Sequence, residues 1–172
     1  MIPLIVRRGE PADIPAVAAL YDGAVAWLVE LGNTGQWGTE PISGRPGRVV
    51  TYETWVAERA LWVAETDGVV VGAITLGSRQ PYVDAVPEPE LYVQSFVTDR
   101  SRKGSGIGHA LLELARAQAR ERGVALLRVD CWAGGGGALV RYYERAGFTR
   151  TQPFIYPHKR GPWHGQILEQ RV

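Results

Sequence analysis

The sequence predicts a mixed α/β domain with elements in the order β–α–(α)–β–β–β–α–β–α–β–β. Apolar residues recur at helical spacing in three segments, and strand-like apolar runs separate those segments. An Asp-Gly pair between two apolar runs adds a hairpin signal. At 172 residues one domain is the default, and we expect it to span residues 1–172.

The N-terminal third predicts a strand, a helix, a loop and a short helix. Residues 2–7 are apolar enough for an opening strand, and Asp13 is placed to cap a helix that runs to about Leu31. Glycines and prolines crowd residues 32–50, which predicts a loop. A short helix is expected over residues 52–59.

The middle of the chain predicts three strands. Residues 61–65 and 69–76 form the hairpin, and a proline-rich loop follows over residues 77–89. Residues 90–98 read as a strand in which alternate side chains share a face. One face is expected to carry Leu91, Val93, Ser95 and Val97, and the other Glu90, Tyr92, Gln94 and Phe96.

The remaining segments predict two helices and three strands. A helix over residues 107–122 ends at Gly123, and a strand follows over residues 124–131. A short helix closes at Gly147, with Leu139, Tyr142, Tyr143 and Ala146 on one face. Final strands are expected over residues 148–155 and 166–172, with a loop between them.

Composition excludes several classes of function. The net charge of +1 gives no field that would attract nucleic acid or anionic lipid, so neither partner is expected. The single cysteine fits a reducing, cytoplasmic setting. No apolar run reaches the roughly 18 residues of a membrane span, and the three histidines lack metal-ligand spacing, so no metal is expected.

Eight of the 21 glycines lie between Gly104 and Gly137, in two clusters. The first cluster follows a strand, stands beside basic residues and opens a helix, whose unpaired N–H groups and dipole favour a phosphate. A nucleotide P-loop would need Lys-Ser/Thr after the last glycine, and a dinucleotide fingerprint would need a third glycine where His109 or Leu111 stands. Both of these alternatives therefore fail.

The segment from Lys103 to Gly108 (KGSGIG) resembles the acetyl-CoA pyrophosphate motif of the GNAT superfamily of N-acetyltransferases, Gln/Arg-x-x-Gly-x-Gly/Ala. Lysine replaces the usual Gln/Arg, and Arg102 stands one residue earlier, so either cation is open as the main phosphate contact. The segment from Tyr143 to Phe148 is similar to the Tyr-x-x-x-Gly-Phe that ends the family's next helix.

The resemblance implies a central, mostly antiparallel sheet of six to seven strands, flanked by helices and splayed at the central strand. It implies acetyl-CoA as co-substrate, with the thioester held by backbone N–H groups near the end of residues 90–98. The cofactor-binding residues carried over in this way are Phe96, Val97, Arg102, Lys103, Gly104, Ser105, Gly106, Ile107, Gly108 and His109.

The resemblance also implies transfer of acetyl to a primary amine by direct attack. Tyr143 matches the family's general acid, with Tyr142 as the alternative if the register is off by one. Glu90 is the candidate base, with Glu88 and Asp84 as substitutes.

The acceptor remains open, and a small-molecule amine is preferred over a protein. Its site is expected among residues 33–48, 78–90 and 154–165, with aromatic candidates Trp37, Tyr82, Tyr156 and Trp163. A non-catalytic acyl-CoA sensor on the same scaffold and a nicotinamide-dependent oxidoreductase are the rival functions. Monomer and homodimer are equally compatible with the chain.

Overall fold

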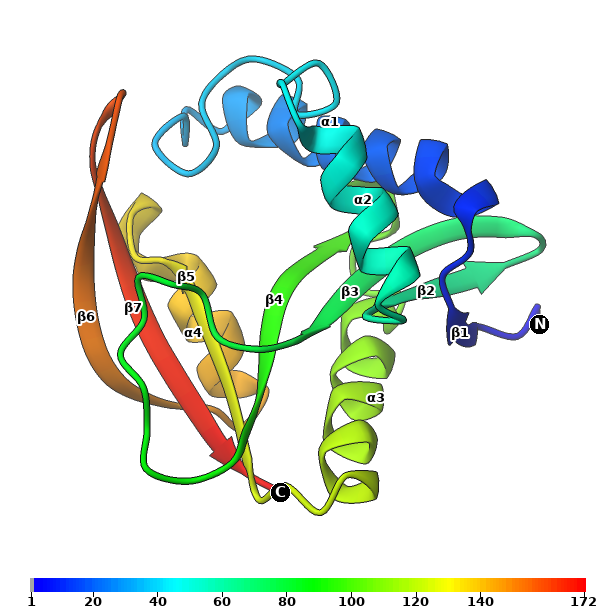
Figure 1. Ribbon diagram of the computed structural model, residues 1–172. Helices are drawn as coiled ribbons and strands as arrows, with labels where there is room; N and C mark the ends of the chain where they lie inside the picture. Colours follow the sequence, from blue (N-terminus) through cyan, green and yellow to red (C-terminus); the bar gives the residue numbers. More distant parts are fainter. Residues whose placement is uncertain (1) are drawn as a thin grey trace.

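Seven strands form one sheet in the order β1-β2-β3-β4-β5-β7-β6 in the computed structural model, which describes residues 2–172 (Figure 1). Only the β4–β5 pair is parallel, and every other neighbouring pair is antiparallel. The strands are β1 (Ile5–Arg8), β2 (Leu61–Thr66), β3 (Val69–Gly77), β4 (Glu90–Thr98), β5 (Leu126–Trp132), β6 (Thr149–His158) and β7 (Gly161–Arg171). The expected mostly antiparallel sheet is confirmed.

Helices cover both faces of the sheet. The helices are α1 (Ile14–Glu30), α2 (Arg48–Ala57), α3 (Ile107–Glu121) and α4 (Ala138–Arg145), with short 3-10 turns at Pro11–Asp13, Arg100–Arg102 and Gly135–Gly137. Apolar residues of α1 and α2 pack with β2, β3 and Val97 in one core cluster. Those of α3 and α4 pack on the opposite face, in a cluster that includes Leu91, Val93 and Leu168. Helix α2 begins four residues earlier than expected.

The β2–β3 hairpin forms as predicted. Asp67 and Gly68 at its tip have φ angles of 52° and 72°. Two consecutive positive φ angles define the type I′ turn, whose twist matches the flanking strands. The Asp-Gly signal therefore specified the turn and the pairing next to it, whereas the register shifts by one residue at Val71, between the Glu65–Val70 and Ala64–Gly72 pairs.

Strands β6 and β7 form a longer hairpin than expected. The sequence predicts a loop between residues 155 and 166, whereas β6 continues to His158 and β7 begins at Gly161. Pro157 pairs with Pro162, and His158 pairs with Gly161. Prolines are tolerated in a strand where one side has no partner. Strand β6 is the edge of the sheet, and β7 contacts β5 only from Gly165 onward, so neither proline breaks a ladder.

A bulge in β4 corrects the predicted faces of that strand. Thr75 pairs with Ser95 while the adjacent Leu76 pairs with Val93, so Gln94 is an extra residue. An extra residue reverses the alternation of side chains beyond it. Phe96 therefore lies on the α3/α4 face with Leu91 and Val93, and Val97 lies on the α1/α2 face. The sequence predicts the opposite, with Val97 on the face of Leu91 and Val93.

The segment Pro11–Glu30 is long and apolar enough, by length and composition, to cross a membrane. This corrects the expectation that no segment of the chain reaches that threshold. Such a segment is also typical of a core helix. The structure buries Val17, Tyr21 and Leu28 from this helix against neighbouring elements.

Candidate active site

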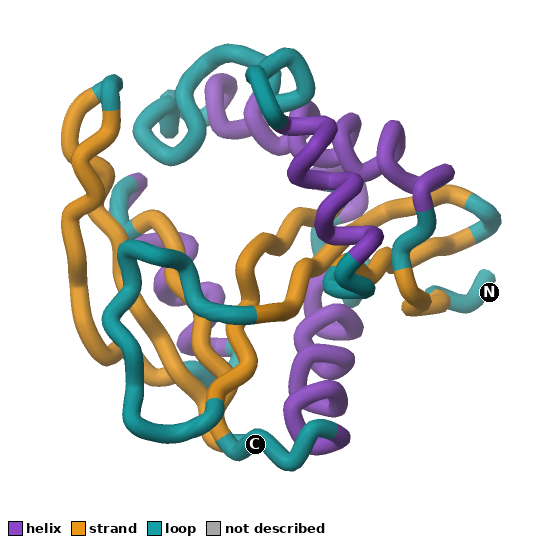
Figure 2. The backbone as a smooth tube through the Cα atoms, viewed as in Figure 1, coloured by secondary structure: helices purple, strands orange, loops and turns teal. Residues whose placement is uncertain are grey.

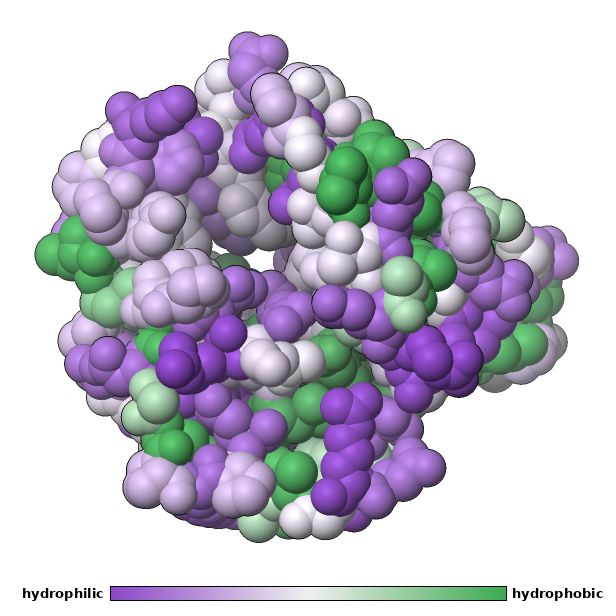
Figure 3. All heavy atoms as spheres, in the orientation of Figure 1, coloured by the Kyte–Doolittle hydropathy of each residue, from purple (hydrophilic) through white to green (hydrophobic). Residues whose placement is uncertain are grey.

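The central feature of the site is an opening between β4 and β5. The two strands pair only from Glu90 with Leu126 to Val93 with Val129, and then part. The tube in Figure 2 shows the upper halves of both strands diverging. The space-filling view is hollowed at this place, between the loop that precedes α2 and the loop that follows β3 (Figure 3). The expected splay at the central strand is thus present.

Backbone groups of β4 face this opening without a strand partner. The amide of Asp99 donates to the carbonyl of Val71 in β3 at 2.8 Å, so the backbone N–H of Asp99 points toward β3. Alternation along the strand then turns Val97 toward β3 and turns Phe96 and Thr98 toward the opening. The amide of Phe96 faces the opening, whereas the amide of Val97 faces β3 and its side chain packs in the core, so Val97 cannot supply the expected N–H.

Thr98 is a residue that the sequence interpretation missed. Its N–H shares the direction of the Phe96 N–H because the two residues lie two positions apart. The alternation of backbone N–H groups along the strand was visible in the sequence. Only the pairing with β3 shows which alternate N–H groups of β4 are bonded to β3 and which stay free.

The glycine-rich turn brings a second set of free amides to this region. Gly104 and Gly106 both have a φ of +81°, a conformation that favours glycine, and a side chain added at either would meet no atom within 4 Å. Space in front of the turn is therefore open. Helix α3 begins at Ile107, so its first N–H groups lack helical partners and carry the positive end of the dipole. This cradle fits a pyrophosphate.

The basic residues of the turn have different partners. Arg102 forms an ion pair with Asp99, with 3.2 Å between Nε and Oδ2. Within residues 2–172, Lys103 has no carboxylate partner within 4 Å and is exposed. Arg100 leaves the turn and packs 3.9 Å from the ring of Trp27.

The other residues of the predicted motif are placed around the same turn. Ser105 donates its hydroxyl to the carbonyl of Arg102 at 2.6 Å. The Ile107 side chain is buried in the core, so only its backbone is available to a ligand. A side chain at Gly108 would stand 2.3 Å from Tyr142 Oη, and His109 is exposed on the first turn of α3.

Tyr143 lies on the side of the opening formed by α4. Its ring is 6.3 Å from that of Phe96 and 5.6 Å from that of Phe148. Burial raises the pKa of the Tyr143 phenol well above its usual range, and the charges of nearby groups, including Asp130, raise it further. The phenol is therefore protonated at neutral pH and able to donate a proton.

Tyr142 lies beside it, nearer the start of α3. The two rings meet edge to face at 5.4 Å, and the Tyr142 hydroxyl lies over Gly108. Burial also raises the pKa of Tyr142. Both rings lie beside that of Phe96, at 6.2 Å for Tyr142 and 6.3 Å for Tyr143, with Tyr143 the more deeply buried of the two.

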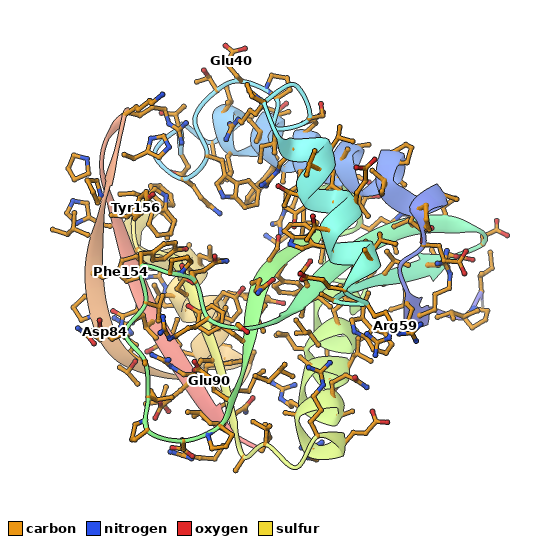
Figure 4. All side chains as sticks on the ribbon, in the orientation of Figure 1. Glu40, Arg59, Asp84, Glu90, Phe154 and Tyr156 are labelled. Carbon is orange, nitrogen blue, oxygen red and sulfur yellow. The ribbon has the colours of Figure 1, made fainter. Side chains whose placement is uncertain are left out.

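The placement of Glu90 argues against its predicted role as base. Its carboxylate forms an ion pair with buried Arg128, with 2.8 Å between Oε2 and Nη1. Six residues separate it from Phe96, a span of about 20 Å along a strand. Figure 4 shows Glu90 at the end of β4 where the strand still adjoins β5. Glu90 stabilises the closed end of the opening.

The two substitutes for Glu90 are no better placed. Glu88 forms a pair of hydrogen bonds with exposed Arg171, at 2.6 and 2.7 Å. The side chain of Asp84 is exposed on the loop after β3, away from the opening in Figure 4.

Asp130 is the acidic residue that the structure brings to the opening instead. It is the first residue of β5 beyond the pairing with β4. Its carboxylate accepts hydrogen bonds from Tyr92 at 2.5 Å and from Tyr82 at 3.3 Å. Burial raises its pKa above the usual range of a carboxyl group, although the two phenols act in the opposite direction.

The predicted acceptor aromatics divide into two groups. Tyr82, Tyr156 and Trp163 join Phe154 in one chain of ring contacts, with centroid distances of 5.0 to 5.9 Å. Trp37 instead packs on Tyr21 of α1, at 5.7 Å. Cys131 is buried, which raises the pKa of its thiol to about 12 and leaves it protonated.

A glycine turn at a helix N-terminus, beside an unpaired strand edge in a splayed sheet, can hold a phosphate-bearing ligand next to free backbone donors. Residues 19–148 match the model of the acetyltransferase (GNAT) family. The chain belongs to this family of acetyltransferases.

Relatives and solved structures agree with this assignment. Mycothiol acetyltransferase of Cellulomonas flavigena is 33% identical over 127 residues, which cover 67% of this chain and 35% of the relative. The chain therefore spans about a third of that protein's length.

Two solved structures share the fold. Ribosomal-protein-alanine N-acetyltransferase from Brucella melitensis aligns with a TM-score of 0.73 at 23% identity, over 98% of this chain and 99% of that one. The yncA protein of Salmonella typhimurium, solved with its cofactor acetyl-CoA, aligns with a TM-score of 0.70 at 22% identity, over 98% and 93% of the two chains.

Proposed function

We propose that the protein transfers an acetyl group from acetyl-CoA to a primary amine of a small molecule. The observation that carries the proposal is the row of free amides on β4 where it parts from β5; the glycine turn before α3 and the buried Tyr143, whose ring lies 6.3 Å from that of Phe96, support it. The similar proteins include a mycothiol acetyltransferase and a ribosomal-protein-alanine N-acetyltransferase, so their names indicate no single class of acceptor. The proposed acceptor therefore depends on the residues of the site.

The residues fit acetyl-CoA as donor. Gly104, Gly106 and the first amides of α3 would hold its pyrophosphate, with Lys103 as the main cation because Arg102 is already paired with Asp99. Bound there, acetyl-CoA would supply an acetyl group activated as a thioester. The N–H groups of Phe96 and Thr98 would donate to the carbonyl oxygen as negative charge builds on it.

The proton balance assigns a task to Tyr143. An ammonium acceptor first loses one proton to water, because only the neutral amine can attack. As the new carbon–nitrogen bond forms and the carbon–sulfur bond breaks, the phenol of Tyr143 gives its proton to the departing sulfur. The nitrogen then loses a second proton, which restores the phenol. The products are the amide, the free thiol and one proton released to solvent.

A thiol-release assay with acetyl-CoA and a panel of amines tests this proposal, with mass spectrometry of the acetylated product. Tyr143→Phe is expected to lower kcat by about 100-fold or more, the usual contribution of a positioned acid. Tyr142→Phe is the matched control and should retain most of the activity. Unchanged turnover in both variants would refute the assignment of an acid. Binding of acetyl-CoA with no acetylation of any amine would favour a non-catalytic acyl-CoA sensor.

We also propose that residues 1–172 act as one acetyltransferase domain in the cytoplasm, as a monomer or homodimer. The nearly neutral net charge supports function without nucleic acid or membrane. Size-exclusion chromatography with light scattering distinguishes the two oligomeric states.

A further inference from the structure

Asp130 differs from two other well-covered carboxylates beside the sheet, Asp13 and Glu90. Asp13 is paired with Arg7 at 2.8 Å, and Glu90 is paired with Arg128 at 2.8 Å. For Asp130, the described part of the chain provides no Lys, Arg or His nitrogen within 4 Å. The side chains that donate hydrogen bonds to it are the neutral phenols of Tyr92 and Tyr82.

This arrangement leaves one negative charge uncompensated. A buried carboxylate is costly unless a cation or several donors offset its lost hydration. Tyr82 and Tyr92 orient the carboxylate but carry no charge. The residue is only partly covered, so a further group can still reach it.

Aromatic rings line the approach to this charge. Tyr82, which donates to Asp130, lies 5.5 Å from Phe154 and 5.0 Å from Tyr156, measured between ring centroids. Tyr82 and Tyr156 are 42% and 40% exposed, so the wall they form is open to a ligand. Figure 4 shows Phe154 and Tyr156 on the side of the β6–β7 hairpin that faces the opening.

A carboxylate without a counter-ion beside open aromatic faces is a site for an organic cation. Aromatic faces attract an ammonium group through their negative ring surface, and the carboxylate supplies the formal charge. Apolar side chains, Phe154 and Ile167, pack beside Tyr92, so the surroundings of that ammonium are apolar.

We propose that Asp130 binds the ammonium group of the acceptor and so selects a monocationic primary amine with an apolar or aromatic body. This inference deepens the proposed function and rests on it. Asp130 bonds to Tyr92 of β4 on one face of the sheet, whereas Tyr143 packs in the cluster on the opposite face, so in this proposal the acceptor and the acid act from opposite sides of the sheet.

The first test is kinetic. Asp130→Asn keeps the size and hydrogen-bonding capacity of the side chain and removes its charge. The KM for benzylamine, or for the best amine of the panel, is expected to rise at least about tenfold, while the KM for acetyl-CoA changes less than about twofold. Asp84→Asn removes the same charge from an exposed position nearby and should leave both values unchanged. An unchanged KM for the amine in Asp130→Asn would overturn the inference.

The second test measures binding without turnover. Benzyltrimethylammonium should bind the protein by calorimetry and compete with the amine, and benzyl alcohol, which has no charge, should bind at least about tenfold more weakly. Asp130→Asn should abolish this preference, and Tyr82→Leu should reduce it. Equal binding of the two probes would overturn the inference. If the parent acetylates no amine yet keeps an Asp130-dependent preference for the cation, the proposed function fails and the cation site stands.

Discussion

Replacing Gly106 with alanine is expected to lower the free energy of unfolding by about 1–2 kcal/mol. The added methyl group would meet no other atom within 4 Å, so the effect comes from the backbone alone. Gly106 precedes α3 with a φ of +81°, and in this conformation an alanine Cβ crowds the following carbonyl oxygen. For a chain of this size, each kcal/mol corresponds to about 2–4 °C in Tm.

Gly23→Ala is the matched control for this prediction. Gly23 lies in the middle of α1, where an added methyl group also meets nothing within 4 Å. Alanine in a helix is more stable than glycine by about 0.5–1 kcal/mol, so Tm should rise. The same chemical change is therefore expected to have opposite signs at Gly106 and Gly23.

Thermal and urea unfolding of both variants, with Gly106→Asn as a third, measure these effects. Asparagine tolerates the left-handed conformation better than alanine and should recover part of the loss at Gly106. A Gly106→Ala protein as stable as the parent, or an asparagine variant less stable than the alanine variant, would refute the conformational reasoning. Gly106→Ala should also raise the KM for acetyl-CoA, because its methyl group stands in the open space before the amides.

Three further predictions concern charged residues of the site. Glu90→Ala should lower the free energy of unfolding by about 3 kcal/mol, because it leaves Arg128 buried without its counter-ion. The variant should keep its kcat at temperatures below its Tm. Loss of kcat without loss of stability would contradict this prediction. Burial raises the pKa of the Asp130 carboxyl in the folded protein. The folded state therefore gains stability from protonated Asp130 at a pH below the usual carboxyl pKa, and it loses this stability as the pH rises through the raised pKa. Asp130→Asn should therefore be more stable than the parent in urea at pH 7, with a smaller gain at pH 4, and a less stable variant at pH 7 would be the contrary result. Lys103→Ala should raise the KM for acetyl-CoA more than Arg102→Ala does, because Arg102 is already paired; the reverse order would show that Arg102 is the main contact.

Local signals determined much of the fold. The Asp67-Gly68 pair specified its hairpin, and the strand over residues 90–98 and the helix starting at residue 107 were predicted at the positions where the structure has them. The glycine turn and the likeness of two motifs to the GNAT family placed the donor side of the site. These features depend on neighbours in the chain, so the sequence shows them directly.

Tertiary pairing decided the rest. The bulge at Gln94 exists only in the register of β4 against β3, and it reverses the faces of Phe96 and Val97. Glu90 and Asp130 are both acidic residues on strands, and nothing local distinguishes them. Pairing with β5 gives Glu90 an arginine and closes its end of the sheet, whereas the loss of that pairing leaves Asp130 beside the opening with two phenols and no cation. The sequence alone indicated where a phosphate-bearing donor could bind, because the glycine turn and the helix that follows it are local features. The choice of the carboxylate proposed to bind the acceptor depends on contacts between residues 38 or more positions apart, which only the tertiary structure shows.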